Sequence, residues 1–417
     1  MPSTTLLAAH VPRASAGSGT DAALAGSVIL AAILFNPVLA IVNGHVMGLS
    51  SKIVIAAEVA IVGLALVLTA RRFTPAMTPW LVMMALAGVF ALLRTLGTGS
   101  FEPKYLRDVM LIPVFVMLGM TVRPDRLGQT IGIATAITVA GMLVEGFRLD
   151  WYRDLFKVQD YYSATRGVSP EDFWDQEVGL YPSAVREDRL LAFVDVHRLS
   201  SVFLEPVSLG NFAAILMTYV LACHRWLSAR MIVFLVLAGI ALLVGCDGRL
   251  AFVGLFLILA VAALSPLLPP YSAVLFLPFA IVAVCLATWI GGFNHEGNDF
   301  PSRLAHTVWL LESYGPMEYL GLSDAFAAKA VDSGIAYLIY TQSALGVAAV
   351  WIMLTLSSRH ETGPQVRYLN GIAVYVCATM LVSASFASIK TAALMWFILG
   401  ALQNDGADRQ QTRQRSG

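Results

Sequence analysis

Apolar stretches long enough to cross a lipid bilayer recur along almost the whole chain. A spanning helix needs about 20 mostly apolar residues. Twelve runs approach that length, at 22–42, 52–70, 79–98, 108–122, 128–146, 207–223, 231–247, 250–266, 271–290, 334–356, 367–384 and 387–402. Only 13% of the 417 residues are charged, whereas a soluble domain has about 25%. We therefore expect an all-α polytopic membrane protein with about twelve transmembrane helices.

Two long hydrophilic segments interrupt this pattern, at 147–206 and 291–333. The other connections are short, and residues 22–402 are expected to form one integral membrane domain. Residues 1–21 and 403–417 are expected to be tails. The first tail is rich in Ser, Ala and Gly and lacks the basic start of a signal peptide.

The basic residues of the short connections indicate the orientation. Cytoplasmic loops carry an excess of Lys and Arg, so the N-terminus is placed in the cytoplasm. That side then holds Arg71, Arg72, Arg123, Arg126, Arg225, Arg230, Arg359 and Arg367. Both long segments, in which acids outnumber bases, fall on the extracytoplasmic side. We expect both termini in the cytoplasm.

A second group of charged residues lies at or near the outer ends of the expected helices. A charge inside the bilayer costs several kcal/mol unless it is paired or faces water, which makes such residues candidates for function. Snorkelling to the interface is the alternative for each one taken alone. The group consists of Lys52, Arg94, Lys104, Arg107, Arg249 and Lys390, with the acids Glu58 and Glu145.

Three arginines, of which Arg249 belongs to the group above, have the chemistry of a phosphate site. Guanidinium groups bind phosphate oxygens through paired, charge-assisted hydrogen bonds. Arg198 ends the first long segment, Arg249 opens an apolar run, and Arg303 lies in the second long segment. Together, and with Arg94 and Arg107, they could hold a pyrophosphate without a metal ion. For Arg249, a structural ion pair with Asp247 is the alternative.

Candidate general bases lie in the same two segments. They are Glu205, His306 and Asp332, and His197 is a further candidate. Glu205 could equally hold an arginine in place, because it precedes Pro206 at a helix start where the dipole keeps it ionised. The sequence has no GxGxxG, GxxxxGK[ST] or DxD motif. An activated donor carried by a lipid is therefore favoured over a sugar nucleotide, and no cofactor is expected.

Three blocks carry a resemblance to a known family. The stretch from Arg198 to Gly210, with Phe203-Leu-Glu205-Pro206, resembles a segment of bacterial surface-polysaccharide polymerases. So do Gly248-Arg249-Leu-Ala-Phe and the residues from Ser302 to Gly346. Together they resemble the O-antigen polymerase and ligase superfamily (Wzy-type and WaaL-type) over roughly residues 195–350.

This resemblance implies a GT-C-like glycosyltransferase of the bacterial inner membrane, with its active site facing the periplasm. A growing glycan would be transferred from undecaprenyl pyrophosphate to the next lipid-linked repeat unit by a polymerase, or to lipid A core by a ligase. Family ligases usually carry a His-Asn or His-Ser pair before the helix glycine. Here the pair before Gly346 is Asp332-Ser333, which favours the polymerase.

The partners implied by the resemblance are undecaprenyl-pyrophosphate-linked oligosaccharides, membrane lipid, a flippase and a chain-length regulator. No nucleic-acid partner is expected, since Lys plus Arg and Asp plus Glu are balanced at 27 each. A transporter of lipid-linked sugar or another solute is the alternative from a different class. Aromatic residues of the first long segment could stack on sugar rings or pack a small subdomain; they are Trp151, Tyr152, Tyr161, Tyr162, Phe173, Trp174 and Tyr181.

Overall fold

The computed structural model describes residues 19–169, 179–184, 190–191, 197–297, 299–330 and 332–404. Within these ranges the chain forms helices and connections and no β-strand. Phe173 and Trp174 lie outside the described residues. The longer elements are α1 (Gly19–His45), α2 (Ser51–Ala70), α3 (Thr78–Thr98), α4 (Pro103–Met120), α5 (Leu127–Phe147), α8 (Pro206–Cys223), α9 (Ala229–Cys246), α10 (Arg249–Leu264), α11 (Phe276–Gly291), α15 (Gly334–Ser357), α16 (Gly363–Met380) and α17 (Ile389–Ala401).

Each of the twelve apolar runs overlaps one of these helices over most of its length. In the described part of the chain, eight are long and apolar enough to cross a membrane: α1, α2, α3, α5, α8, α9, α11 and α15. Two shorter apolar helices, α10 and α17, accompany them. The chain is therefore consistent with a polytopic membrane protein, as the sequence predicted.

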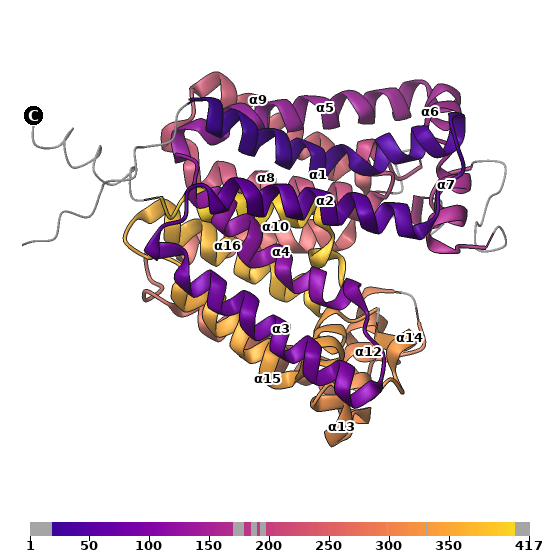
Figure 1. Cartoon of the computed structure of the whole chain (residues 1–417), viewed down its shortest axis with the longest axis vertical. Coiled ribbons are helices and arrows are strands. Elements are labelled where there is room, and N and C mark those ends of the chain that lie inside the picture. Colours follow the sequence, from indigo (N-terminus) through magenta and orange to yellow (C-terminus); the bar gives the residue numbers. More distant parts are fainter. Residues whose placement is uncertain are drawn as a thin grey trace, which may run out of the picture.

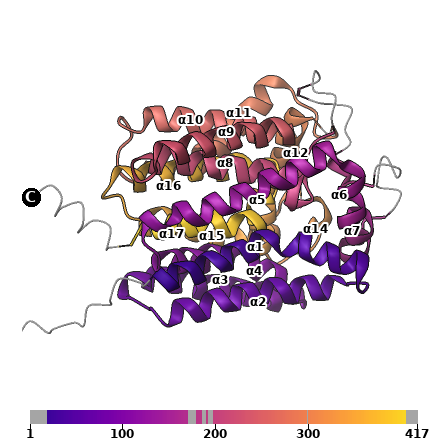
Figure 2. The same cartoon turned by 90° about the horizontal axis from the view of Figure 1, so that it is seen from above.

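The described residues of the two long segments contain short helices. The first contains α6 (Leu149–Phe156) and α7 (Val158–Arg166), and the second contains α12 (Phe300–Ser313), α13 (Pro316–Tyr319) and α14 (Ala327–Ala330). Helices α6, α7, α12 and α14 lie at the same end of the bundle (Figures 1 and 2). We call this the loop end.

Polar contacts fix which helix termini lie at the other end. Asp21 at the start of α1 pairs with Arg72 at the end of α2. Asn404, after α17, donates to the carbonyls of Met120 and Val122 at 3.0 and 3.1 Å. Helices α2, α4 and α17 therefore all begin at the loop end.

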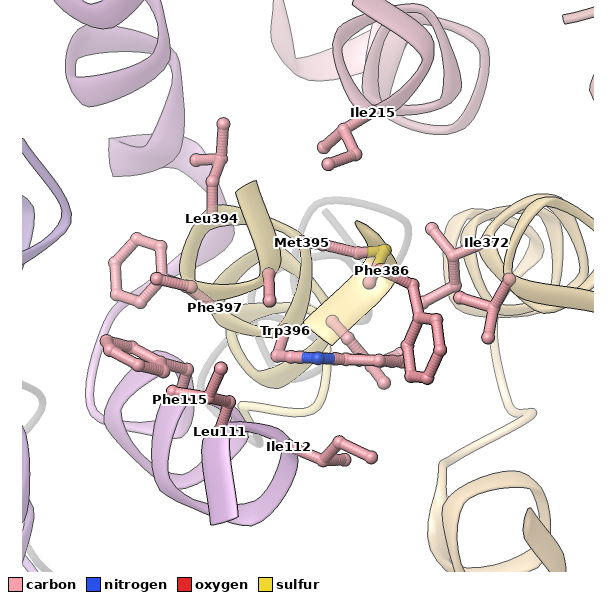
Figure 3. Packing of buried hydrophobic residues seen from close by; sticks show 14 of the residues in the cluster. Leu111, Ile112, Phe115, Ile215, Ile372, Phe386, Leu394, Met395, Trp396 and Phe397 are labelled. Carbon is pink, nitrogen blue, oxygen red and sulfur yellow. The ribbon is translucent and has the colours of Figure 1, made fainter. Parts of the chain in front are cut away.

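Helix α17 is the centre of the core, and all of its residues are buried. Trp396 lies beside Ile112 of α4 and Phe397 lies near Phe115 of the same helix, whereas Leu394 points away from α4 (Figure 3). Small residues allow this close approach. A Cβ at Gly400 would meet the backbone of Val116, so only glycine fits there. A short helix thus gains its stability from packing.

Helix α15 is not continuous. Its Ser343 has φ 65° and ψ 160°, which breaks the helix into two parts. The Ser343 hydroxyl accepts a hydrogen bond from the Gly346 N–H at 3.1 Å and so caps the second part. The apolar run 334–356 gave no sign of this break, because serine is compatible with a helix.

Candidate functional site

A cavity of about 660 Å³ lies at the loop end of the bundle. Its walls come from the middle of α1, the first half of α2, the first turns of α4, α8, α15 and α17, the second half of α7 and the turn 383–388. Its charged lining residues are Glu58, Lys104, Arg107, Asp108, Arg166, Glu205, Asp332 and Lys390. Serine hydroxyls and the side chains of Tyr161, Tyr181 and Tyr337 add further polar groups, and apolar side chains line the rest of the cavity.

On one wall, a single carboxylate pairs with two bases. The Glu205 Oε1 lies 2.5 Å from Arg166 Nη1, and its Oε2 lies 3.0 Å from Lys390 Nζ. The Lys390 side chain is 2% exposed, whereas 43% of the Arg166 side chain remains accessible. Arg166 also lies over the ring of Tyr162, at 4.5 Å from its centroid. We call these three charged residues the Glu205 cluster.

The two bases keep Glu205 ionised. Burial alone would raise the pKa of the Glu205 carboxyl, but Arg166 and Lys390 outweigh it and lower the pKa to about 2. A carboxylate with so low a pKa, already held by two cations, is a poor proton acceptor near neutral pH. Glu205 therefore positions Arg166 and Lys390, which is one of the two roles that the sequence left open.

The backbone before Glu205 is held in an unusual shape. Ser201 and Leu204 have φ of 53° and 60°, in the left-handed region that non-glycine residues rarely adopt. Glu145 of α5 accepts hydrogen bonds from the N–H groups of Ser200 and Ser201 at 2.7 and 2.6 Å. The buried Glu145 thus stabilises the turn that directs Glu205 into the cavity.

On another wall, the charges are reversed, since one base pairs with two acids. Arg107 donates to Asp108 at 2.9 and 2.5 Å and also pairs with Glu58. The Tyr337 hydroxyl donates to the second Asp108 oxygen at 2.6 Å. These bonds engage three of the five N–H donors of a guanidinium. We call Arg107, Glu58 and Asp108 the Arg107 cluster.

Two of the charged lining residues belong to neither cluster. Lys104 of α4 lies 5.7 Å from the ring centroid of Tyr337. Asp332, between α14 and α15, is exposed to the cavity. Among the described residues, neither Lys104 nor Asp332 has an ion pair, so both are available to a ligand.

Of the residues predicted for the site, the structure brings Arg107, Glu205 and Asp332 together in the cavity. Arg198 does not line it. Its guanidinium donates to the carbonyls of Cys246 and Ser183 at 3.0 and 2.9 Å, and the residue is 8% exposed. Arg198 thus joins the first long segment to the end of α9.

The other residues predicted to bind pyrophosphate or to act as the base also lie outside the cavity lining. Arg249 begins α10, and Arg303 lies in α12. The ring of His306 forms a hydrogen bond with the Lys329 carbonyl at 3.1 Å. Arg94 is buried in a polar cluster described below.

Sequence reasoning missed Arg166 and Asp108 as site residues. Asp108 adjoins Arg107 at the edge of an apolar run, so the rule for charges inside the membrane could have found it. Arg166 lies in a segment full of charges, where no local pattern distinguishes it. Among the described residues, no three His, Cys, Asp or Glu side chains gather closely enough to hold a metal ion.

The fold and the cavity together define a helical, multi-spanning protein with a charged chamber at one end. Comparisons of the chain with protein-family models, with curated proteins and with solved structures found no match.

Proposed function

We propose that the chain is a polysaccharide polymerase acting on lipid-linked oligosaccharides. In this proposal twelve helices span the bacterial inner membrane in a GT-C-like arrangement, with both termini in the cytoplasm and the cavity facing the periplasm. A growing glycan passes from undecaprenyl pyrophosphate to a sugar hydroxyl of the next lipid-linked repeat unit.

The observation that carries the proposal is the cavity itself. It lies at the end of the bundle that bears both long segments, and its volume of about 660 Å³ is in the range of small-molecule sites. Lining cations, hydroxyls, tyrosines and an unpaired Asp332 supply groups for phosphate and for sugar hydroxyls. The arginines of the short connections lie at the other end, as the positive-inside rule requires for a periplasmic cavity.

The Glu205 cluster suits the donor pyrophosphate. It has one positive charge more than negative, and Arg166 remains accessible for two-point binding of phosphate oxygens. The eight charged lining residues balance overall, so anion binding depends on directed N–H donors rather than on a net positive field. These donors stabilise the charge that develops on the leaving pyrophosphate.

Asp332 is the proposed general base. It accepts the proton of the acceptor hydroxyl while that oxygen bonds to the anomeric carbon of the donor sugar. The bond from this carbon to the pyrophosphate oxygen breaks, and undecaprenyl pyrophosphate leaves with the electron pair. A single displacement of this kind inverts the anomeric configuration.

The test uses purified protein in liposomes with lipid-linked repeat units, and gel electrophoresis reads the glycan ladder. We expect elongation in excess EDTA. Arg166→Lys should lower the rate about a hundredfold, as loss of an oriented donor does elsewhere. Arg249→Lys and Arg303→Lys should stay near the wild-type rate. A loss in these two with none in Arg166→Lys would move the site to the arginines predicted from sequence.

The acceptor distinguishes polymerase from ligase. If lipid A core and not a second repeat unit receives the glycan in the same assay, the protein is a ligase and the polymerase proposal is wrong. A deletion strain gives the same distinction in cells, since loss of a ligase leaves bare core, whereas loss of a polymerase leaves single repeat units or no polymer.

A second candidate function is transport of an anionic solute or a lipid-linked sugar. The break of α15 at Ser343 favours it, because transporters bind substrates at discontinuous helices. The charged clusters, however, lie at one end of the bundle and not at its middle. Movement of labelled substrate across the liposome membrane without a new glycosidic bond would support transport over polymerisation.

A further inference from the structure

Arg94 was expected to bind pyrophosphate, but its contacts assign it another task. The residue is 5% exposed and lies near the end of α3. Its Nη1 donates to the carbonyls of Gly321 and Tyr340 at 3.3 and 3.0 Å. Its Nη2 donates to the Tyr340 hydroxyl at 2.8 Å and pairs with Asp324. A buried guanidinium with these four acceptors has little capacity left for a substrate.

These contacts join parts of the chain that are distant in sequence. Helix α3 packs beside α15 (Figure 1), and Arg94 connects both to the loop 320–324. In that loop Gly321 has φ 71°, and a Cβ there would lie 3.0 Å from the N atom of Ser343. The loop therefore rests directly on the break in α15.

The contacts of Arg94 extend to the cavity wall through tyrosine rings that pack edge-on. Arg94 lies over the rings of Tyr105 and Tyr340, at 5.0 and 4.2 Å. The Tyr105 ring packs edge-on against Tyr337 at 5.9 Å, and the Tyr337 hydroxyl binds Asp108 of the Arg107 cluster. Tyr105 itself lies between the lining residues Lys104 and Arg107.

A second connection runs along the chain. From the loop 320–324 the backbone continues through α14 to Asp332, the proposed base. Asp324 is therefore the point at which Arg94 holds the segment that carries Asp332. Its side chain is 49% exposed, so this contact lies at the surface while Arg94 lies beneath it.

We propose that Arg94 is a positioning residue, which fastens the loop 320–324 to the break in α15 and thereby places both Asp332 and the Arg107 cluster. The activity measurements below rest on the proposed function, whereas the exchange measurement does not. An arginine is required because the planar fork reaches two carbonyls, a hydroxyl and a carboxylate at once. A lysine ammonium has only three donors and no fork.

The first experiment measures hydrogen–deuterium exchange without substrate. Replacing Arg94 leaves buried carbonyls without a donor and endangers folding, so the half-exposed Asp324 is the better target. In Asp324→Ala, amides of residues 320–330 should exchange roughly threefold to tenfold faster. Asp125→Ala is the matched control, since Asp125 is 47% exposed and also pairs with an arginine, Arg123. Equal exchange in wild type and Asp324→Ala would overturn the proposal.

The second experiment separates positioning from simple stabilisation. In Asp324→Ala, kcat should fall roughly threefold to tenfold with KM for the donor unchanged, because the loop carries Asp332. In Arg94→Lys, kcat should fall and KM should also rise, since the contacts with Tyr105 and Tyr340 are lost too. Wild-type kcat and KM with a lowered Tm would show a structural role only and overturn the proposal.

The two experiments also distinguish a failure of this proposal from a failure of the proposed function. If wild-type protein does not elongate glycan, the polymerase assignment fails, but faster exchange in Asp324→Ala still supports the fastening role of Arg94. If elongation is present and exchange is unchanged, the fastening role fails alone.

Discussion

The two charged clusters of the cavity are mirror images in composition. The Glu205 cluster has one acid between two bases, and the Arg107 cluster has one base between two acids. They also differ in origin. Arg166, Glu205 and Lys390 come from three distant parts of the chain, whereas Glu58, Arg107 and Asp108 come from two neighbouring helices, α2 and α4.

Under the proposed function, this difference in charge assigns different groups of the substrates to the two walls of the cavity. An anion is better placed at the wall with the surplus positive charge, and sugar hydroxyls are better placed at the wall with surplus carboxylates, which accept their hydrogen bonds. In the proposed mechanism, each cluster holds in place the side chains that bind the substrates. Neither supplies a free base, and the proposed mechanism gives that role to Asp332, which has no ion-pair partner among the described residues.

The largest effect is expected for Asp332→Asn. If the clusters bind and Asp332 reacts, glycan elongation should fall about 10²- to 10⁴-fold, the usual contribution of a general base. The Tm and the donor KM should change little, because Asp332 is exposed and has no ion pair among the described residues. Asp150→Asn, an exposed aspartate of α6 outside the cavity lining, is the control. Near-normal elongation in Asp332→Asn would show that Asp332 is not the general base.

The next effect concerns stability and compares the clusters directly. Glu205→Leu leaves Lys390, with 2% of its side chain exposed, without a counter-charge, and should lower the free energy of unfolding by about 3–5 kcal/mol. Glu58→Leu should cost less, because Arg107 keeps Asp108. Thermal unfolding in detergent measures both. Equal losses would show that the two clusters are energetically alike.

A double variant supplies the control for this experiment. Glu205→Leu with Lys390→Met removes the buried charge together with its partner, and should recover most of the lost stability. Elongation should remain low in the double variant, since Arg166 is no longer held in place. Recovery of both properties would show that the cluster has no part in the reaction.

The third effect is a pH dependence confined to the Glu205 cluster. The folded protein holds the pKa of Glu205 at about 2, below its ordinary value of 4.5. The stabilisation is therefore present above pH 4.5 and is lost as the pH falls from 4.5 toward 2, by about 3 kcal/mol in all. Chemical unfolding between these pH values should show the loss in wild type and a smaller loss in Glu205→Gln. Parallel curves would contradict the assigned cause.

The sequence predicted the helices well because spanning helices depend on local composition. Each apolar run became a helix, including the two shortest. The break at Ser343 depends on the loop that contains Gly321, a contact between distant residues that no local pattern contains. The role of α17 as the central helix likewise depends on packing and not on its own hydrophobicity.

Residues of the candidate site could be predicted from the sequence only where a charged residue lies within or at the end of an apolar run. Arg107, Lys104, Glu58 and Lys390 stood out as charges near the outer ends of apolar runs, and all four line the cavity. Arg198 was predicted to bind pyrophosphate because of its motif, but its guanidinium donates hydrogen bonds to the backbone carbonyls of Cys246 and Ser183. A guanidinium that binds phosphate and one that binds carbonyls look identical in a sequence.

The smallest effect tests whether the donor touches both walls. Lys104 is exposed beside the Arg107 cluster and lies over the Tyr337 ring. Lys104→Met should raise the donor KM about twofold to fivefold, comparable with the loss of an exposed ion pair. Lys329→Met is the matched control, because Lys329 also lies over an aromatic ring, that of Trp309, but outside the cavity lining.

The size of this effect relative to Arg166→Lys locates the pyrophosphate. An ammonium on an exposed stem is strongly hydrated, so it gains little from one more anionic partner unless the ligand displaces its water. A small rise in KM therefore fits a pyrophosphate held by the Glu205 cluster, with Lys104 reaching only its edge. If Lys104→Met instead weakened binding as much as Arg166→Lys, the pyrophosphate would have to bridge the cavity, and the surplus carboxylate of the Arg107 cluster would then oppose it.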